Sequence, residues 1–472
     1  MLYDDTIAAI ATPPGEGGIG IVRISGPDAL PILERVFIPA RRGAWRPFRM
    51  RFGRLTDNNG ATVDEALAVY MRAPHSFTAE DVAEISCHGG PLVLSRVLAT
   101  ALACGARQAE PGEFTMRAFL NGRLDLTQAE ATLDVIKAKT GAALALAQAQ
   151  LAGWLAGELR RVRELLLRPL AYVTALIDFP EDEVEAQDIA APLDAGLRAL
   201  EQLLATADQG LVYRQGARVA LVGRPNTGKS SLLNALLRAD RAIVTPIPGT
   251  TRDTLEELAN LCGIPVVLVD TAGIAETADP VERLGVARSR AALAAADVAV
   301  LVLDVSAPPT DEDEAIVALS EDKPTVLVLN KIDLLAEDKQ TSRQADKERE
   351  SVLPVSLSAC LPVSPSQFAA VVMTSALTGA GIDDLADAIA TLLLGGAALG
   401  GERMITNPRH RDALRRAIAS LRDAIAGHAG GAPPDLLAVD LTVALAAIGE
   451  ITGETVGEDL LAAIFSQFCI GK

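Results

Sequence analysis

The sequence predicts a multidomain protein in which an all-α region is interrupted by an α/β domain and preceded by an α+β domain. Short apolar runs broken by Pro and Gly fill residues 1–120, which is typical of a compact α+β domain. Ala- and Leu-rich helical periodicity fills residues 121–212 and returns in residues 382–472. Between them, residues 213–381 alternate apolar strands with helices, as in a doubly wound α/β domain. Because domain insertion is well tolerated, one helical domain interrupted by the α/β domain is the most economical arrangement.

The individual elements follow from the same patterns. In residues 1–120, short apolar runs favour extended segments at Thr6–Ala11, Gly20–Ile24, Leu67–Tyr70 and Val82–Ser86. A helix is predicted after them, at Leu92–Ala103. The predicted strands of the α/β domain are Arg218–Val222, Leu255–Leu261, Val266–Asp270, Val298–Leu303, Thr325–Leu329 and Ala370–Thr374. The predicted helices of the all-α region are Leu151–Leu170, Leu193–Gln209, Ile382–Leu394, Asn407–Ala426 and Leu437–Ile448. Thr127 and Glu130 have the spacing of a helix capping box, and residues 336–367 predict a polar surface loop.

Composition restricts the class of protein. The net charge is −18, and non-specific affinity for nucleic acid comes from cationic surface, so a nucleic-acid substrate would require a local basic patch or a basic partner. The five cysteines have neither disulfide nor metal spacing, which fits a reducing cytoplasm. No run of 18 or more uncharged apolar residues and no basic N-terminal signal are present, so neither a membrane span nor a targeting segment is expected.

A phosphate-binding loop lies at residues 223–230, which have the pattern G-x-x-x-x-G-K-S. The loop follows the strand Arg218–Val222 and opens a helix, which is the context that this motif requires. Its backbone N–H groups and the helix N-terminus favour phosphate oxygens. We expect Lys229 to reach the β and γ phosphates and the Ser230 hydroxyl to bind magnesium.

Four further motifs follow in the order that a Ras-like GTPase requires. Residues 249–253 (G-T-T-R-D) supply a switch threonine, Thr251, for magnesium, and residues 270–273 (D-T-A-G) supply Asp270 and a γ-phosphate sensor at Gly273. Residues 330–333 (N-K-I-D) follow a strand, and the Asp333 carboxylate suits the two donors of a guanine edge. Ser375-Ala-Leu377 follows the last strand and offers a backbone N–H to guanine O6. The predicted GTP-binding residues are Asn226, Thr227, Gly228, Lys229, Ser230, Ser231, Thr245, Pro246, Ile247, Pro248, Gly249, Thr250, Thr251, Asp270, Thr271, Ala272, Gly273, Asn330, Lys331, Asp333, Ser375, Ala376 and Leu377.

The glutamine that orients the attacking water in Ras-like GTPases is replaced by Ile274. Water positioning and charge neutralisation must then come from elsewhere. Glu282 is the candidate for orienting water, while Asn226 offers an oxygen to a monovalent cation and Arg252 is a rival source of positive charge. The alternatives are a solvated Glu282 and an Asn226 that only caps the loop.

Both ends of the chain carry more specific patterns. Residues 11–18 (A-T-P-P-G-E-G-G), the loop 223–231, residues 249–253 and the terminal F-C-I-G-K at 468–472 together resemble the MnmE (TrmE) family of tRNA-modification GTPases, from end to end. The resemblance implies an N-terminal folate-binding and dimerisation domain (1–120), a helical domain in two parts (121–212 and 382–472) and an inserted GTPase domain (213–381).

The resemblance also implies an activity. With an FAD-dependent partner, in a heterotetramer-like complex, a homodimer would add an aminomethyl or carboxymethylaminomethyl group to C5 of the wobble uridine of tRNA. The one-carbon donor would be 5-formyl- or methylene-tetrahydrofolate, and potassium would stimulate GTP hydrolysis as two GTPase domains meet. By resemblance, folate contacts fall on Arg23, Glu84, Arg123 and Lys472, potassium ligands on Asn226, Thr245, Ile247 and Thr250, and magnesium ligands on Ser230 and Thr251.

Cys469, in the terminal motif, is a candidate nucleophile only if the pKa of its thiol is lowered; the alternative is a small cysteine that packs the last helix. Two other functions compete with the one that the resemblance implies. A regulatory or ribosome-assembly GTPase would need no folate, and a folate-dependent methyltransferase could retain an inactive GTPase domain.

Overall fold

The computed structural model describes residues 4–179, 185, 187–239, 256–270, 292–320, 323–335, 367–396, 401 and 403–472. The described chain forms two compact units. The first comprises residues 1–133, 150–197 and 416–472, and the second comprises residues 134–149 and 198–415. No helix among the described residues has both the length and the apolar character needed to cross a membrane.

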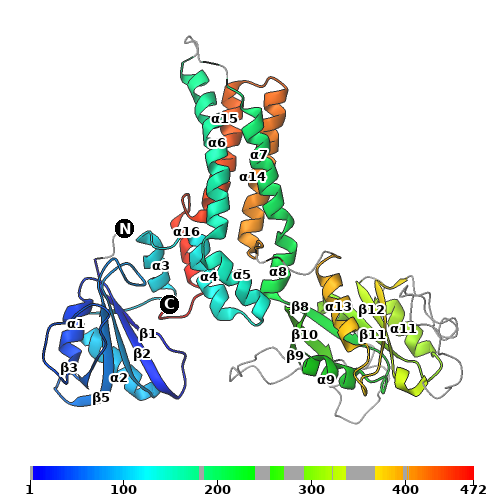
Figure 1. The fold of residues 1–472 in the computed structure, drawn as a ribbon, viewed down its shortest axis with the longest axis horizontal. Helices are drawn as coiled ribbons and strands as arrows, with labels where there is room; N and C mark the ends of the chain where they lie inside the picture. Colours follow the sequence, from blue (N-terminus) through cyan, green and yellow to red (C-terminus); the bar gives the residue numbers. More distant parts are fainter. Residues whose placement is uncertain are drawn as a thin grey trace. The chain divides into compact units, whose positions relative to one another are not determined.

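The first unit is built around a seven-stranded sheet near the N-terminus, with strand order β3-β4-β5-β6-β2-β1-β7. All pairs are antiparallel except β1 with β7, which are parallel. Helices α1 and α2 pack against the sheet (Figure 1). The side chains between the helices and the sheet form a buried core that is mostly aliphatic. The bounds are β1 Ile7–Ile10, β2 Gly17–Ser25, α1 Ala29–Val36, β3 Phe37–Pro39, β4 Arg51–Thr56, β5 Thr62–Met71, β6 Val82–Gly89, α2 Pro91–Ala103 and β7 Arg107–Gln108.

The described residues outside the two sheets and the helices that flank those sheets are mostly helical. The long helices α6 and α15 pack against each other in the first unit (Figure 1). The helices are α3 Glu113–Leu120, α4 Leu126–Lys137, α5 Gly141–Leu151, α6 Trp154–Asp178, α7 Ala190–Ala205, α8 Ala207–Gln215, α14 Pro408–Ala429, α15 Pro434–Thr452 and α16 Glu458–Phe465.

Two local predictions in this region were wrong. The single helix predicted at Leu193–Gln209 is two helices, because the Thr206 hydroxyl donates to Leu203 O at 2.8 Å and accepts from Ile405 N at 3.1 Å, which tightens the turn between α7 and α8. The capping box is not formed by Thr127 and Glu130, both of which lie inside α4. It is formed two residues earlier: Gln128 N donates to Asp125 Oδ1, and Asp125 N donates to Gln128 Oε1, both at 3.0 Å.

The second unit contains a six-stranded sheet with the order β13-β12-β11-β8-β10-β9. Only β9 runs antiparallel to its neighbour; the others are parallel, as expected for a Ras-like domain. The elements are β8 Ala217–Val222, α9 Lys229–Ala239, β9 Glu256–Leu261, β10 Ile264–Asp270, β11 Val298–Asp304, α11 Asp311–Ser320, β12 Thr325–Asn330, the 3₁₀ helix η1 Ile332–Leu335, β13 Ala370–Thr374 and α13 Ile382–Leu393. The predicted strands are therefore confirmed to within two residues, and the predicted fold class is confirmed.

Candidate functional site

The phosphate-binding loop joins β8 to α9, where the strand ends at Val222 and the helix begins at Lys229. The strand is fully buried over its last residues because its aliphatic side chains lie in the core of the sheet. Gly228 has φ +95°, and a Cβ atom there would lie 2.4 Å from Asn330 Nδ2. The loop therefore requires glycine at this position, which brings its backbone against Asn330 at the end of β12.

Lys229 is folded back into the loop. Its Nζ donates to Gly223 O at 2.8 Å and to Arg224 O at 2.7 Å, and the residue is only 4% exposed. Burial lowers the pKa of this lysine, although the carboxylates of Asp270 and Glu312 act in the opposite direction. Among the described residues, the acceptors of this buried ammonium are carbonyl oxygens, so it is well suited to exchange them for negatively charged phosphate oxygens.

Ser230 and Asp270 bring two oxygen donors together at the end of the loop. The Ser230 hydroxyl donates to Asp270 Oδ2 at 2.7 Å, and Asp270, at the end of β10, is 5% exposed. Hydroxyl and carboxylate oxygens are the ligands that Mg²⁺ prefers. The donor set therefore fits magnesium, which would be held by Ser230 directly and by Asp270 directly or through water.

Asn330 connects the phosphate loop with the loops after β12 and β13, which carry the predicted guanine contacts. Its Nδ2 donates to Thr227 O at 2.9 Å, while its Oδ1 accepts from the Thr374 hydroxyl and from Ala376 N, both at 3.2 Å. The residue is 1% exposed. One buried side chain thus fixes three segments that are far apart in the sequence.

The predicted base-recognition residues follow on from Asn330. The Ser375 hydroxyl donates to Asp333 Oδ1 at 2.5 Å, which holds the carboxylate that would accept from guanine. Lys331 has φ +69° and forms a 2.6 Å ion pair with Asp304, which aligns the loop after β12. Leu377 is 85% exposed, a position from which an apolar side chain can cover a planar ring.

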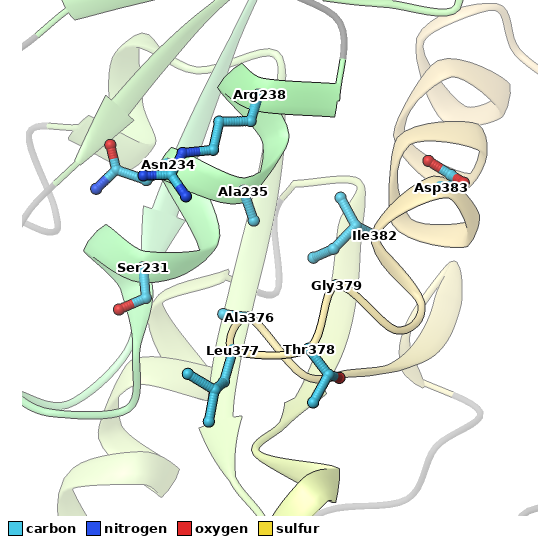
Figure 2. Close-up of a pocket in the computed structure, with 10 residues that line it drawn as sticks. All are labelled: Ser231, Asn234, Ala235, Arg238, Ala376, Leu377, Thr378, Gly379, Ile382 and Asp383. Atoms are coloured by element: carbon cyan, nitrogen blue, oxygen red, sulfur yellow. The ribbon is translucent and has the colours of Figure 1, made fainter.

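A cavity of about 540 Å³ opens beside these loops. Figure 2 shows the α9 side chains Ser231, Asn234 and Arg238 on one side of it and the loop from Ala376 to Gly379 on the other. Asn226, the predicted potassium ligand, is an exposed residue of the loop with φ +64°. Thr227 is buried, and its hydroxyl donates to Arg224 O at 3.0 Å.

A second group of predicted site residues lies in the first unit. Arg23 on β2 and Glu84 on β6 are directly paired in the sheet register, and Arg23 Nε donates to Glu84 Oε1 at 2.8 Å. Arg123 Nη1 donates to Phe77 O at 2.9 Å. Both guanidinium groups stack on the Phe77 ring, with Arg23 at 5.5 Å and Arg123 at 5.0 Å from its centroid.

The C-terminal segment completes this group. Ile470 forms an isolated β-bridge with Pro111, and Gly471 O accepts from Arg23 Nη1 at 3.4 Å. Gly471 has φ +96°, and a Cβ there would lie 2.3 Å from Ile10 O, so the tail approaches β1 closely. Arg23, Glu84, Arg123 and the tail that carries Lys472 are therefore brought to one region, where Lys472 is partly buried. Cys469 is a free cysteine with an exposed side chain.

Comparison with known proteins decides the family. A family model described as "MnmE helical domain" matches residues 126–469, and one described as "GTP-binding protein TrmE N-terminus" matches residues 6–123. The chain is 66% identical over 472 residues to the tRNA modification GTPase MnmE of Roseiflexus sp. (strain RS-1), with 100% of both chains covered. It is 65% identical over 472 residues to that of Roseiflexus castenholzii, with 100% of both covered. It is 60% identical over 471 residues to that of Chloroflexus aurantiacus, which covers 99% of this chain and 100% of the relative.

The chain belongs to the MnmE family of tRNA modification GTPases. Some of the residues predicted for this MnmE-family GTPase lie outside the described residues. These are Thr245, Pro246, Ile247, Pro248, Gly249, Thr250, Thr251, Arg252, Thr271, Ala272, Gly273 and Glu282, together with the polar stretch 336–366. Their roles stay predictions.

Several residues near the predicted folate contacts Arg23 and Arg123 of this MnmE-family chain were not predicted from the sequence. Phe77 and Phe114 both lie under the Arg23 guanidinium, at 5.5 and 5.6 Å. Arg117 is fully buried, with ion pairs to Asp5 at 2.6 Å and Glu113 at 2.9 Å. No sequence signal marks these residues, because each contact joins segments that come together only in the folded chain.

Proposed function

We propose that the chain couples GTP hydrolysis to folate-dependent modification of the wobble uridine of tRNA. In this proposal a homodimer acts in the cytoplasm with an FAD-dependent partner protein. Together they add a carboxymethylaminomethyl or aminomethyl group to C5 of the uridine. The observation that carries the proposal is that one chain holds both the P-loop, which Asn330 joins to the loops after β12 and β13, and the Arg23–Glu84 pair, which the C-terminal tail contacts.

In the GTPase domain, proposed as residues 213–381, Lys229 binds the β and γ phosphates and Asp333 accepts from the guanine edge. Ser230 and Thr251 hold magnesium, which neutralises phosphate charge when bound. Asn226, with Thr245, Ile247 and Thr250, holds potassium in the place of an arginine finger, and Glu282 orients the attacking water. Support comes from the 2.7 Å contact between Ser230 and Asp270 and from the exposure of Asn226.

In the N-terminal domain, proposed as residues 1–120, the ligand is a tetrahydrofolate carrying a one-carbon unit. The Glu84 carboxylate accepts from the guanidine-like edge of the pterin, and Arg23, Arg123 and Lys472 bind the ligand's carboxylates. Support comes from the Phe77 ring, which holds Arg23 and Arg123 within 5.5 and 5.0 Å of its centroid and so keeps two cationic groups close together.

Calorimetry with 5-formyl-tetrahydrofolate on the full chain tests the folate assignment. Glu84→Gln removes a charge-assisted hydrogen bond worth about 1.5–3 kcal/mol, so binding is expected to weaken roughly 10- to 150-fold while GTP affinity is unchanged. Arg96→Gln, which breaks an exposed ion pair of α2 with Asp57, is the matched control and is expected to bind like the wild type. Absence of binding by the wild type would favour a regulatory GTPase without folate chemistry.

GTP hydrolysis measured in potassium and in sodium tests the cation assignment. The proposal predicts a faster rate in potassium and loss of that difference in Asn226→Ala. Equal rates in the two salts would rule out the potassium site.

A further inference from the structure

Residues 37–56 differ sharply in charge from the rest of the chain. They contain six arginines, at 41, 42, 46, 49, 51 and 54, and no Asp or Glu, whereas the whole chain carries a net charge of −18. The segment runs from β3 through a long connection into β4, at the edge of the N-terminal sheet. On an acidic protein, a concentrated positive surface favours contact with a polyanion at that surface.

One of these arginines builds the segment. Arg51 Nη1 donates to Gly43 O at 2.8 Å, and its Nη2 donates to Arg41 O. Its guanidinium lies 5.0 Å from the centroid of Trp45, which packs in turn against Phe37 at 5.8 Å. The connection is therefore an ordered structure held by Arg51 and by the indole ring.

A second anchor fixes the outer part of the connection. Phe48 N donates to Tyr70 O at 2.8 Å, and Arg49 N donates to Arg46 O at 3.2 Å across a turn. Phe48 has φ +59°, and its side chain is 62% exposed. Met50 and Phe52, at 58% and 52% exposed, continue this apolar rim.

The other five arginines of the segment are exposed to solvent. Arg41, Arg42, Arg46, Arg49 and Arg54 are exposed, and their side chains make no ion pair or hydrogen bond with any described residue. Arg54 is opposite Glu65 in the β4–β5 register, but the two do not form an ion pair. Solvated guanidinium groups that form no ion pair remain available to phosphate, which they bind in a bidentate manner.

We propose that this surface, defined by Arg41, Arg42, Arg46, Arg49 and Arg54 and called the arginine surface, binds the phosphate backbone of tRNA. The inference rests on the proposed function, which makes tRNA the substrate. RNA fits better than a lipid surface or an acidic protein, because the exposed Phe48 ring beside the arginines can stack on an unpaired base. The arginines position the tRNA and supply no chemistry.

Binding of an unmodified tRNA transcript to the full chain, measured by fluorescence anisotropy between about 50 and 200 mM salt, tests the proposal. The variant R41Q/R42Q/R46Q/R49Q keeps Arg51, which builds the segment. The magnitude of the slope of log affinity against log salt is expected to fall by about 3. Up to four phosphate contacts are lost, and each contributes roughly 0.7–0.9 to that slope. Affinity at the lower salt concentration is expected to fall at least about tenfold, and the GTPase rate is expected to stay unchanged.

The matched control is R160Q/R161Q/R163Q/R168Q, which removes the same charge from α6 in the same unit. Its salt slope is expected to equal that of the wild type. The separate pairs R41Q/R42Q and R46Q/R49Q are each expected to lower the slope by about half as much as the quadruple variant. They keep the test valid if the quadruple variant unfolds. Phe48→Ala is expected to lower affinity without changing the slope, because a stacking contact releases no counterion.

The outcomes separate this inference from the proposed function. If the wild type binds tRNA and the quadruple variant has the same affinity and slope, the arginine surface is not the binding site, while the function stands. If the wild type binds no tRNA at any salt concentration, direct contact with the substrate fails as well. If the quadruple variant loses binding to phosphatidylserine vesicles and keeps full binding to tRNA, the surface serves a membrane and the proposal is wrong.

Discussion

Asn330→Ala is the substitution that most directly tests how the nucleotide site is assembled. The wild-type side chain is 1% exposed and makes three hydrogen bonds, at 2.9, 3.2 and 3.2 Å, to Thr227, Thr374 and Ala376. Alanine leaves the Thr227 carbonyl and the Ala376 N–H without these partners. Each unsatisfied buried group costs about 1–3 kcal/mol, and the Thr374 hydroxyl can rotate toward another acceptor.

The expected loss in unfolding free energy is therefore about 3 kcal/mol, near the lower end of the summed range. Because Asn330 holds the phosphate loop against the guanine loops, a similar loss is expected in GDP binding, or about 100-fold in Kd. Thermal unfolding of the full chain without nucleotide and titration with a fluorescent GDP analogue measure the two effects. Asn59→Ala, in an exposed turn of the first unit, is the control. It is expected to change the free energies of unfolding and of GDP binding by no more than about 0.5 kcal/mol each. Wild-type stability and GDP affinity in Asn330→Ala would refute the view that this side chain organises the site.

Three further predictions concern the two sites. Gly471→Ala places a Cβ 2.3 Å from Ile10 O at φ +96°; strain of about 1–3 kcal/mol should weaken 5-formyl-tetrahydrofolate binding roughly 5- to 150-fold in calorimetry, with GTP hydrolysis retained. Asp333→Asn should lower GTP affinity at least about 100-fold and improve binding of xanthosine triphosphate in competition assays, because the amide donates where the carboxylate accepts. Burial alone would raise the pKa of Glu113, but hydrogen bonds from Arg107, the Glu110 N–H and Arg117 hold that pKa below its usual 4.5. The ionised Glu113 carboxylate therefore adds its full contribution to the free energy of unfolding above about pH 4.5, and this contribution is lost as the pH falls through the lowered pKa of the folded protein. The free energy of unfolding of Glu113→Gln should accordingly change less with pH in this acid range than that of the wild type.

The GTPase domain could be predicted in detail because its determinants are local. The buried strands are continuous aliphatic runs, and the loop 223–230, Asp270, residues 330–333 and Ser375 lie at or directly after the ends of β8, β10, β12 and β13. These strands are parallel, so their carboxyl ends meet at one edge of the sheet. Asn330 was predicted as a nucleotide contact; its role as a link between three loops became visible only from its hydrogen bonds.

The N-terminal domain was less predictable. Strand β4 (Arg51–Thr56) was missed because arginines and a glycine interrupt its apolar pattern, and α1 (Ala29–Val36) was missed because it is short and contains Pro31. The cluster around Arg23 joins residues as far as 448 positions apart, at Gly471, so no local pattern announces it. Only the resemblance to a family pointed to these residues before the fold brought them together.

We propose that this chain links GTP hydrolysis to modification of the wobble uridine, and mass spectrometry of tRNA nucleosides measures that link. A strain lacking the chain is complemented with the wild type or with Lys229→Ala, whose P-loop cannot hold the phosphates. The 5-carboxymethylaminomethyl and 5-aminomethyl uridines are expected to disappear in the deletion strain, to return with the wild type and to stay absent with Lys229→Ala. Unchanged nucleosides in the deletion strain, or full modification restored by Lys229→Ala, would contradict this proposal.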